Sequence, residues 1–151
     1  MQVMPSHQEY KYLPYTPQQL FELVADVEKY PEFLPWCLAC KIMKQTPNFI
    51  EANMIVGFKM VKERFMTRVY LKREEFIIDI EYLHGPFEYL ENRWRFIAKE
   101  NGGCNLDFTI RYQFRSSLLQ TLSAIFFAEA MRKLTNAFEK RAYQLYHIRN
   151  T

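Results

Sequence analysis

Glycine is scarce in this chain and aromatic residues are abundant: its 151 residues include 4 Gly but 13 Phe, 10 Tyr and 2 Trp. Large rings are favoured in β-strands and in the walls of apolar pockets. The composition therefore predicts a β-rich interior built largely from aromatic side chains. At 18.3 kDa the chain has the common size of one domain, so we expect a single domain over residues 1–151.

The sequence also lacks a long hydrophobic run. The longest largely apolar stretch, residues 118–131, is interrupted by Gln120, Ser123 and Glu129 and is shorter than the ~20 residues that a membrane-spanning helix needs. The first nine residues do not have the pattern of a signal or transit peptide. We therefore expect a cytoplasmic protein, unless a presequence has been removed, with peripheral contact with the inner membrane as an open option.

Neither sign of charge dominates. A net charge of +3 and a pI near 8.7 are only mildly basic, so charge alone does not indicate a nucleic-acid-binding protein. Basic residues do gather on one predicted hairpin, where Lys62, Arg64 and Arg68 share one strand face. That strip is suited to contact phosphates of RNA or of anionic lipid. The alternative is a solvated strand face that discourages edge-to-edge pairing.

Signs of metal, redox and catalytic chemistry are sparse. Cys37 and Cys40 form a C-x-x-C motif, but Cys104 is isolated and the three histidines have no ligand spacing, whereas a closed zinc site needs four ligands. No nucleophile elbow, zincin motif, phosphate-binding loop or dinucleotide fingerprint occurs. We therefore expect reduced thiols, no metal, no cofactor and no catalytic residue.

Hydrophobic periodicity predicts the order of the elements. Residues 6–12 are extended, residues 18–28 have helical spacing after the start signal Thr16-Pro17, and residues 30–37 are rich in proline and rings. From about Cys37 to Phe114, apolar and polar residues alternate between turn signals. Because no helical crossover is available in that stretch, we predict an antiparallel meander.

A long helix with one broad apolar face is predicted from residue 116 to about residue 147. Arg141 falls inside that face. Leu118, Leu122 and Ile125 lie on the back of the first turns, which makes this end apolar nearly all round. Either the proline-rich segment or the short helix covers it, or it is a docking face for a membrane surface or a partner.

Together these elements make an α+β fold, a curved antiparallel sheet wrapped around a long C-terminal helix. Where rings line both walls, the gap left by a curled sheet can hold a ligand; alternatively, the rings fill a close-packed core. Asn92 has inward parity beside Trp94. Its amide either ties a backbone bend or offers a polar group to a ligand.

Several motifs along the chain form a recognisable set. They are Tyr30-Pro31-Glu32-Phe33-Leu34-Pro35-Trp36-Cys37, Val56-Gly57-Phe58, Arg68-Val69, Gly85-Pro86-Phe87, the stretch Leu90 to Trp94, and Ala137-Phe138-Glu139-x-Arg141-Ala142. This set resembles the coenzyme-Q-binding, START-related family of the polyketide cyclase-like superfamily, whose bacterial members are often labelled RatA-type. The resemblance extends over about residues 6–146, and the octapeptide is its most specific part.

The resemblance implies the helix-grip fold of START domains and a hydrophobic cavity that binds ubiquinone or a related isoprenoid lipid. Ubiquinone would be a bound ligand, held by a quinone carrier or chaperone that supports respiratory electron transport without catalysis. It also implies two alternatives. One is a RatA-type toxin that binds the large ribosomal subunit and blocks subunit association; the other is an aromatase/cyclase-like enzyme that uses Asn92 or Arg141.

Carried onto this chain, the resemblance and the strand parity nominate ligand-contacting residues. Asn92 or Arg68 is expected to meet a quinone oxygen, and apolar side chains are expected to line the cavity or its mouth. The lining set is Phe33, Leu34, Trp36, Phe58, Phe87, Trp94, Phe127 and Met131. We expect the mouth where residues 30–37, the turn at residues 85–87 and the start of the final helix meet.

Overall fold

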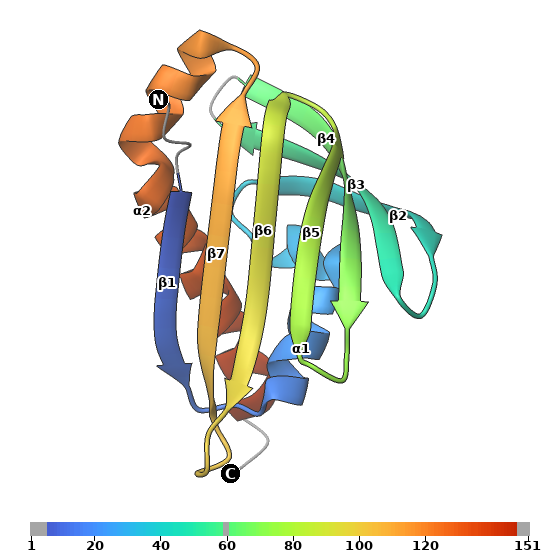
Figure 1. The fold of residues 1–151 in the computed structure, drawn as a ribbon, viewed down its shortest axis with the longest axis vertical. Coiled ribbons are helices and arrows are strands. Elements are labelled where there is room, and N and C mark those ends of the chain that lie inside the picture. Colours follow the sequence, from blue (N-terminus) through green and yellow to red (C-terminus); the bar gives the residue numbers. More distant parts are fainter. Residues whose placement is uncertain (1–5, 59–60, 148–151) are drawn as a thin grey trace.

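A seven-stranded antiparallel sheet, in the order β1-β7-β6-β5-β4-β3-β2, forms one layer of the protein (Figure 1). The computed structural model describes residues 6–58 and 61–147. The strands are β1 (Ser6–Leu13), β2 (Cys37–Gln45), β3 (Phe49–Phe58), β4 (Val61–Lys72), β5 (Ile77–His84), β6 (Phe87–Ala98) and β7 (Cys104–Phe114). The predicted curved sheet around a long C-terminal helix is confirmed, as is the meander without helical crossovers.

Alternation of apolar and polar residues explains the strands. In β7, the fully buried Cys104, Leu106 and Phe108 alternate with partly exposed neighbours, as expected of a strand with one face on a core. We call the sheet face that the helices cover the inner wall. From the end of β7 a short loop leads directly into the long helix, and the helices lie on one side of the sheet (Figure 1).

The short helix α1 (Pro17–Ala25) begins with a capping box, in which Thr16 and Gln19 exchange side-chain-to-backbone hydrogen bonds. It ends at Ala25, before the predicted Glu28. The backbone leaves helical geometry at Asp26, and the buried Tyr30 hydroxyl donates to the Val24 carbonyl oxygen. A 3-10 helix, η1 (Val27–Glu32), follows and contains Pro31. The prediction of one continuous helix to Glu28 was therefore wrong.

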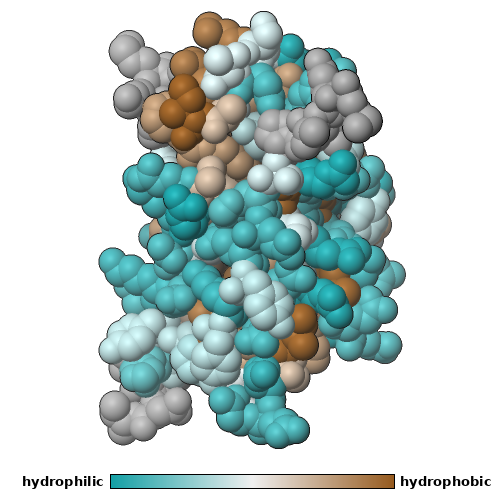
Figure 2. Space-filling model, turned by 60° about the vertical axis from the view of Figure 1, so that its left-hand side comes forward, coloured by the Kyte–Doolittle hydropathy of each residue, from teal (hydrophilic) through white to brown (hydrophobic). Residues whose placement is uncertain are grey.

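The first half of the long helix α2 (Ser117–Ala142) is largely exposed. Ser116 caps it by accepting a hydrogen bond from the Leu119 N–H, and a π-helical turn, η2 (Tyr143–His147), continues it. Hydrophobic side chains gather on the surface where α2 begins (Figure 2). Four of them are Leu118, Leu122, Ile125 and Phe126, which are 67%, 48%, 71% and 58% exposed. We call these four residues the exposed apolar patch.

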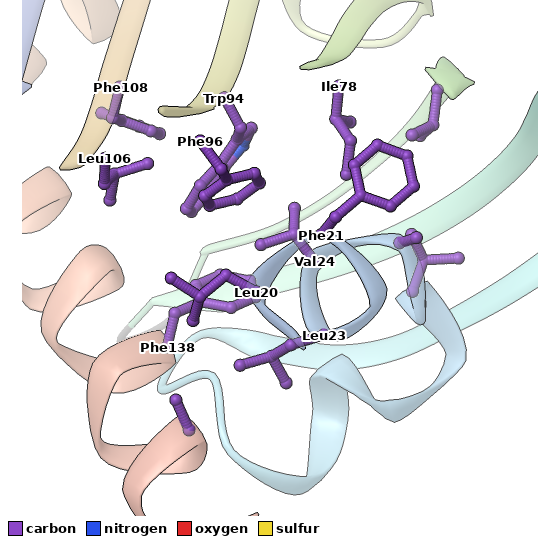
Figure 3. Packing of buried hydrophobic residues seen from close by; sticks show 14 of the residues in the cluster. Leu20, Phe21, Leu23, Val24, Ile78, Trp94, Phe96, Leu106, Phe108 and Phe138 are labelled. Carbon is purple, nitrogen blue, oxygen red and sulfur yellow. The ribbon is translucent and has the colours of Figure 1, made fainter. Parts of the chain in front are cut away.

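The second half of α2 is packed on the sheet. Its buried residues are Thr135, Phe138 and Ala142. The Phe138 ring lies edge-on to the ring of Trp94, 4.8 Å between centroids, and beside Leu20 of α1 (Figure 3). Apolar side chains of α1, such as Leu20, and rings of the sheet, such as Trp94, therefore pack closely around Phe138 at this end of the molecule.

The proline-rich segment also lies against the second half of α2. The Phe33 and Tyr30 rings are 5.1 and 5.3 Å from Phe138. The Arg141 guanidinium lies over the Phe33 ring and its Nη2 donates to Glu32 Oε1 at 2.9 Å. The expectation that this segment or the short helix covers the start of α2 was therefore wrong, because these aromatic and ionic contacts hold it at the far end. Among the described residues, no helix is both long and apolar enough to cross a membrane.

Phe138→Ala should lower the free energy of unfolding by about 3–5 kcal/mol, because it leaves a cavity among closely packed rings. Phe126→Ala is the matched control on the same helix: its ring is exposed, so the loss should stay within about 0.5 kcal/mol. Urea denaturation followed by circular dichroism measures both values. Similar losses for the two variants would contradict the division of α2 into a packed and an exposed half.

Candidate functional site

Burial decreases along the inner wall toward the first half of α2. The side chains of Ile78, Trp94 and Phe108 are almost fully buried. Farther along, Ile80 of β5, Leu90 of β6 and Phe114 of β7 are half-buried, although Ile110 and Tyr112 between them on β7 stay buried. Phe127 and Met131 of α2 are half-buried too. We call this set the half-buried strip; its members are Ile80, Phe87, Leu90, Phe114, Phe127 and Met131. An apolar wall that is incompletely covered is suited to take an apolar ligand.

Stacked rings build one end of this strip. Tyr112 stacks on Phe127 of α2 with 3.8 Å between centroids, and Phe87 stacks on Phe114 at 4.4 Å. The Tyr112 hydroxyl is 3.1 Å from Ser123 Oγ, and burial raises the pKa of this phenol, so it is neutral and able to donate. These contacts hold the first half of α2 near the sheet without burying any of its side chains completely.

The predicted site residues fall into separate groups. Phe87, Phe127 and Met131 are members of the half-buried strip, and the Phe87 and Phe127 rings both contact the Tyr112 ring. Trp94 and Leu34 are buried in the closed core, where Phe33 packs against Phe138. The remaining two are less informative: Trp36 is half-buried with its carbonyl bonded to the Gly57 N–H at 2.9 Å, and the Phe58 side chain lies outside the described residues.

Asn92 is buried on the inner wall, and its amide joins β6 to β7 by a hydrogen bond. Its Nδ2 donates to the Thr109 carbonyl oxygen at 2.8 Å, and its Oδ1 accepts from Trp94 Nε1 at 2.9 Å. The structure thus has the backbone tie that was one of the two sequence-based readings. A ligand oxygen would have to share an amide that already has two protein partners.

Arg68 lies on the outer face of the sheet, away from the inner wall. Its Nη2 donates to Glu51 Oε1 at 2.7 Å and its Nη1 to the Tyr70 hydroxyl at 3.3 Å. These hydrogen bonds raise the pKa of its guanidinium. The expectation that Arg68 meets a quinone oxygen in the interior was wrong, because strand alternation places it with Lys62 and Arg64 on the opposite face.

A depression of about 760 Å³ lies over β4 to β7 and is lined mainly by outer-face residues. Its lining is Tyr70, Lys72, Asp79, Glu81, Glu91, Arg93, Thr109 and Arg111, together with Ile80, Asn92 and Ile110 of inner parity between them. Its charges are paired: Asp79 accepts from Arg93 Nε at 2.6 Å and lies 2.9 Å from Lys72 Nζ. The Tyr70 hydroxyl donates to Glu81. Because these charges already satisfy one another, this depression is a polar surface of paired groups, unlike the apolar half-buried strip.

The orientation of β1 is opposite to the one that its hydropathy favours. Tyr10 and Tyr12 are exposed, whereas His7, Glu9 and Lys11 lie on the side of β1 that faces α2. The polar residues of α2 that contact β1 are the feature from which this orientation could have been predicted. One of them is Thr135, whose hydroxyl donates to Glu9 although the two residues are more than 120 positions apart in the sequence.

The three cysteines are free thiols. Their burial disfavours the thiolate, which is the reactive form of cysteine. Burial raises the pKa of Cys37 to about 11, of Cys40 to about 12 and of Cys104 to about 11. Residues 6–58 and 61–147 contain no group of three or more His, Cys, Asp or Glu residues that could hold a metal ion.

Comparison with known proteins gives matches over nearly the whole chain. The family model described as "polyketide cyclase / dehydrase and lipid transport" matches residues 13–139. A protein from Rickettsia prowazekii named ribosome association toxin RatA is 37% identical, with 94% of this chain and 99% of that protein covered. A mitochondrial protein from Xenopus laevis named coenzyme Q-binding protein COQ10 homolog B is 32% identical, with 93% of this chain and 59% of that protein covered.

Solved structures have the same architecture. An 18 kDa protein from Caulobacter crescentus is 38% identical, with a TM-score of 0.78 and 95% and 99% of the two chains covered. A START superfamily protein from Mycobacterium smegmatis has a TM-score of 0.80 at 19% identity, covering 93% of this chain and 98% of that one. The Zhui aromatase/cyclase from Streptomyces has a TM-score of 0.84 at 14% identity, covering 94% and 95%. The last two likenesses concern the fold alone.

Iodoacetamide should modify the native thiols very slowly at pH 8, since only about one in a thousand thiols with a pKa near 11 is ionised at that pH. Because the thiolate fraction rises as pH approaches the raised pKa, the rate should increase about tenfold per pH unit up to pH 10. Mass spectrometry at successive times measures the rate, and the urea-unfolded chain is the control. Modification of Cys37 and Cys40 as fast in the folded as in the unfolded protein would contradict their inert environment.

Proposed function

The chain belongs to the polyketide cyclase / dehydrase and lipid transport family, and on that premise we propose that it binds ubiquinone or a related isoprenoid lipid against the half-buried strip. The observation that carries this proposal is the incomplete burial of the strip beneath the first half of α2. In this proposal the protein is a quinone carrier or chaperone that supports respiratory electron transport. Its COQ10 relatives, named for coenzyme Q binding, support this choice of ligand.

Apolar burial supplies the driving force for such binding. Covering one large aliphatic or aromatic side chain is worth about 1.5–3 kcal/mol. The half-buried strip combines branched side chains such as Ile80 and Leu90 with the flexible Met131, a residue type that adapts to different ligand shapes. An isoprenoid tail has repeated methyl branches and no hydrogen-bonding group, so it matches a wall of this kind.

Binding without catalysis fits the polar groups near the site. A cyclase-like reaction needs an available polar group, and Asn92 and Arg141 were the candidates. Asn92 is bonded to Trp94 and Thr109, while Arg141 bonds Glu32 and lies over Phe33. Both side chains therefore stabilise the fold through these contacts. Because neither is placed as a free polar group for a reaction, this favours a carrier over an enzyme.

Contact with a membrane surface is the second part of the proposal, because a lipid carrier has to take up and release its cargo there. The exposed apolar patch is suited to enter the interface of a bilayer. The exposed Arg115 directly precedes the N-cap of α2, and its backbone N–H donates to the Pro86 carbonyl oxygen at 3.0 Å. A cation at this end of the helix is suited to meet anionic headgroups.

Met131→Glu should reduce binding of ubiquinone by tenfold or more, because the ligand would have to bury a carboxylate. Lys133→Glu is the matched control, since Lys133 is exposed on the same helix and pairs with Glu129; it should bind normally. Organic extraction of the purified proteins followed by mass spectrometry gives the bound lipid, and titration with ubiquinone gives the affinity. Absence of isoprenoid lipid together with no uptake by the unmodified protein would contradict the proposal.

Association with ribosomes is the second candidate function, and the outer face of β2 and β4 favours it. Lys41, Lys62 and Arg64 are exposed and have the same outer parity by strand register, which makes a basic surface suited to RNA phosphates. Relatives named ribosome association toxin RatA support this candidate.

Lys62→Glu with Arg64→Glu should abolish sedimentation of the protein with large ribosomal subunits, because charge reversal removes the electrostatic attraction to phosphate. Arg132→Glu with Lys133→Glu, on the exposed side of α2, is the control with the same change of charge and should sediment as before. Binding that survives the reversal at Lys62 and Arg64 would eliminate this surface as the ribosome contact.

A further inference from the structure

The first three turns of α2 carry no charged side chain. The uncharged run extends over residues 116–128, between Arg115 and Glu129. We call residues 117–128 the α2 tip. It contains the exposed apolar patch, which lies at one end of the molecule (Figure 2). Because a surface helix normally has charged or polar side chains on its outer face, this segment is not typical of a surface that meets water alone.

One face of the helix changes from apolar to charged at Glu129. Leu118, Leu122 and Ile125 are spaced so that they lie on the same exposed face of α2. At the same helical spacing this face continues with Glu129 and Lys133, which are exposed and lie 3.6 Å apart as an ion pair. The helix therefore has an apolar end and a charged continuation, with a sharp boundary between them.

Three polar side chains of the α2 tip are hydrogen-bonded within the protein. Thr121 Oγ1 donates to the Ser117 carbonyl oxygen at 2.9 Å, and Ser123 Oγ donates to the Gln120 carbonyl oxygen at 3.0 Å. Gln120 Oε1 accepts the Phe114 N–H at 2.8 Å. Polar groups that already have partners cost less free energy to remove from water. The outer face of the tip then presents few groups to an ionic or hydrogen-bonding partner.

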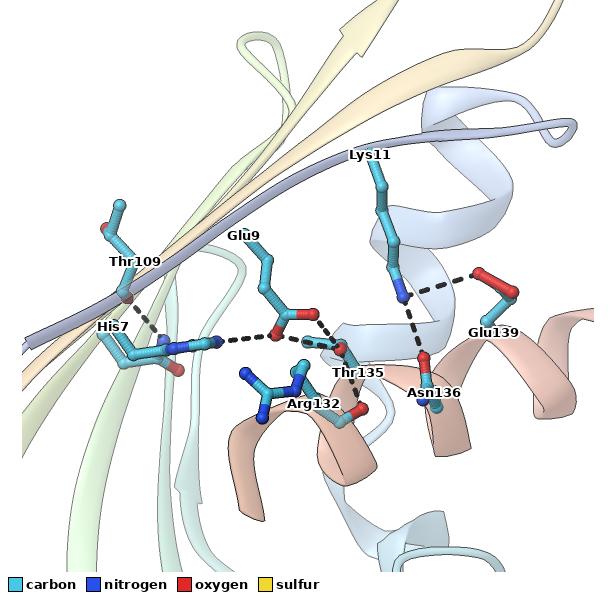
Figure 4. Close-up of polar contacts among 9 residues, drawn as sticks. His7, Glu9, Lys11, Thr109, Arg132, Thr135, Asn136 and Glu139 are labelled. Carbon is cyan, nitrogen blue, oxygen red and sulfur yellow. Dashed lines mark hydrogen bonds and ion pairs between the residues drawn. The ribbon is translucent and has the colours of Figure 1, made fainter. Parts of the chain in front are cut away.

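The second half of α2 is held by the edge strand β1. Figure 4 shows polar side chains of β1 reaching toward this part of the helix. The Thr135 hydroxyl donates to Glu9 Oε1 at 2.9 Å, and Lys11 Nζ donates to Asn136 Oδ1 at 3.2 Å. Lys11 Nζ also lies 3.4 Å from Glu139 Oε1. These contacts fix the direction of the helix, so the α2 tip can meet a flat surface while the fold stays intact.

The size of the exposed apolar patch argues against a second copy of the chain as its partner. Its four side chains, between 48% and 71% exposed, present an area on the order of a few hundred Å². A stable protein–protein interface buries about 800 Å² on each partner, with about one hydrogen bond per 100–200 Å². A bilayer requires no such area and no hydrogen-bonding partner, because an apolar helix face enters its interface by apolar burial.

Lipid charge has few groups to act on at this end of the helix. From residue 113 to residue 128, Arg115 is the only charged residue. One cation near an anionic membrane surface raises the affinity about fivefold. Several large apolar side chains contribute more, since each gains free energy on leaving water. An uncharged apolar face of this kind is suited to membranes with loose lipid packing, where gaps between acyl chains admit large side chains.

We propose that the α2 tip enters loosely packed regions of a lipid bilayer, so that lipid packing rather than lipid charge determines where the protein docks. This inference rests on the membrane contact proposed above and names the kind of bilayer that the contact selects. In the docked protein, Leu118, Leu122 and Ile125 lie below the headgroups, whereas Glu129 and Lys133 stay at their level. The charged boundary thus sets the depth of insertion.

Flotation with phosphatidylcholine vesicles tests the choice of bilayer. Small sonicated vesicles of the dioleoyl lipid are loosely packed, and large vesicles of the same lipid with cholesterol are tightly packed. The unmodified protein should bind the small vesicles about tenfold more tightly or better, and high salt should leave this binding unchanged. Phosphatidylserine added to the large vesicles should raise binding by no more than about fivefold.

Leu122→Ser with Ile125→Ser should lower the affinity for the small vesicles by about tenfold or more, because two large apolar side chains are lost from the contact. Lys140→Ser with Gln144→Ser is the matched control, since both residues are exposed toward the other end of the chain's last helical segment, and it should bind as before. Circular dichroism should show that both double variants are folded.

A fluorophore sensitive to polarity measures the depth of insertion. Attached at Ile125→Cys, its emission should shift to shorter wavelength when small vesicles are added. Attached at Lys140→Cys, it should not shift. The introduced thiol is labelled first at neutral pH, because it is exposed while burial raises the pKa of the native thiols, for example that of Cys37 to about 11.

The outcomes separate this inference from the carrier function. Binding that requires phosphatidylserine and is lost in high salt would overturn the inference, since a basic surface would then make the contact. Equal binding to both kinds of packing, or a dimer in sedimentation equilibrium that Leu122→Ser with Ile125→Ser dissociates, would also overturn it. Failure to float while ubiquinone still binds would remove the docking surface alone, whereas flotation without any ubiquinone binding would remove the carrier function and leave the docking surface.

Discussion

The Phe138 ring is the point on which the arrangement of the long helix depends. It contacts Trp94 on the sheet and Tyr30 and Phe33 in the segment that follows α1. Arg141, one turn farther along, holds the same segment through Glu32 and Phe33. Aromatic burial at this level is among the largest single contributions to a small core, so the second half of α2 is fixed.

Because α2 is a continuous helix of 26 residues, the packing of its second half determines where its first half lies. The first half extends beyond the closed core, held there by the stacking of Phe127 on Tyr112 and the contact of Ser123 with the Tyr112 hydroxyl. Its apolar side chains face water on one side and an incompletely covered sheet on the other. A stable core and an exposed apolar surface can therefore coexist, because they lie at opposite ends of the same helix.

The repeating parts of the fold could be predicted from the sequence. Strands such as β7 separate water from the core, so their residues alternate in polarity, and the capping signals at Thr16 and Ser116 mark where helices begin. For the candidate site, pattern and resemblance nominated Phe87, Phe127 and Met131, which are all half-buried in the structure; their contact with a ligand stays a prediction. They also indicated the exposed start of α2.

The rest depended on contacts between distant segments. Hydropathy suggests that tyrosines of β1 face inward, but α2 offers Thr135 and Glu139 as partners, and these polar groups select His7, Glu9 and Lys11 instead. The sequence also did not predict which end of α2 the proline-rich segment covers, because the contacts of Phe138 and Arg141 determine this. Arg68 was misplaced since a motif match says nothing about the face on which a side chain lies.

The central claim is that lipid binds between the sheet and the first half of α2. Intermolecular nuclear Overhauser effects from a bound ubiquinone analogue, recorded on protein with labelled methionine methyl and phenylalanine ring groups, test it most directly. Contacts are expected from the ligand to the Met131 methyl group and to the rings of Phe127 and Phe87, with none to Phe138. Contacts confined to residues of the outer face, or to Phe138 in the closed core, would contradict it.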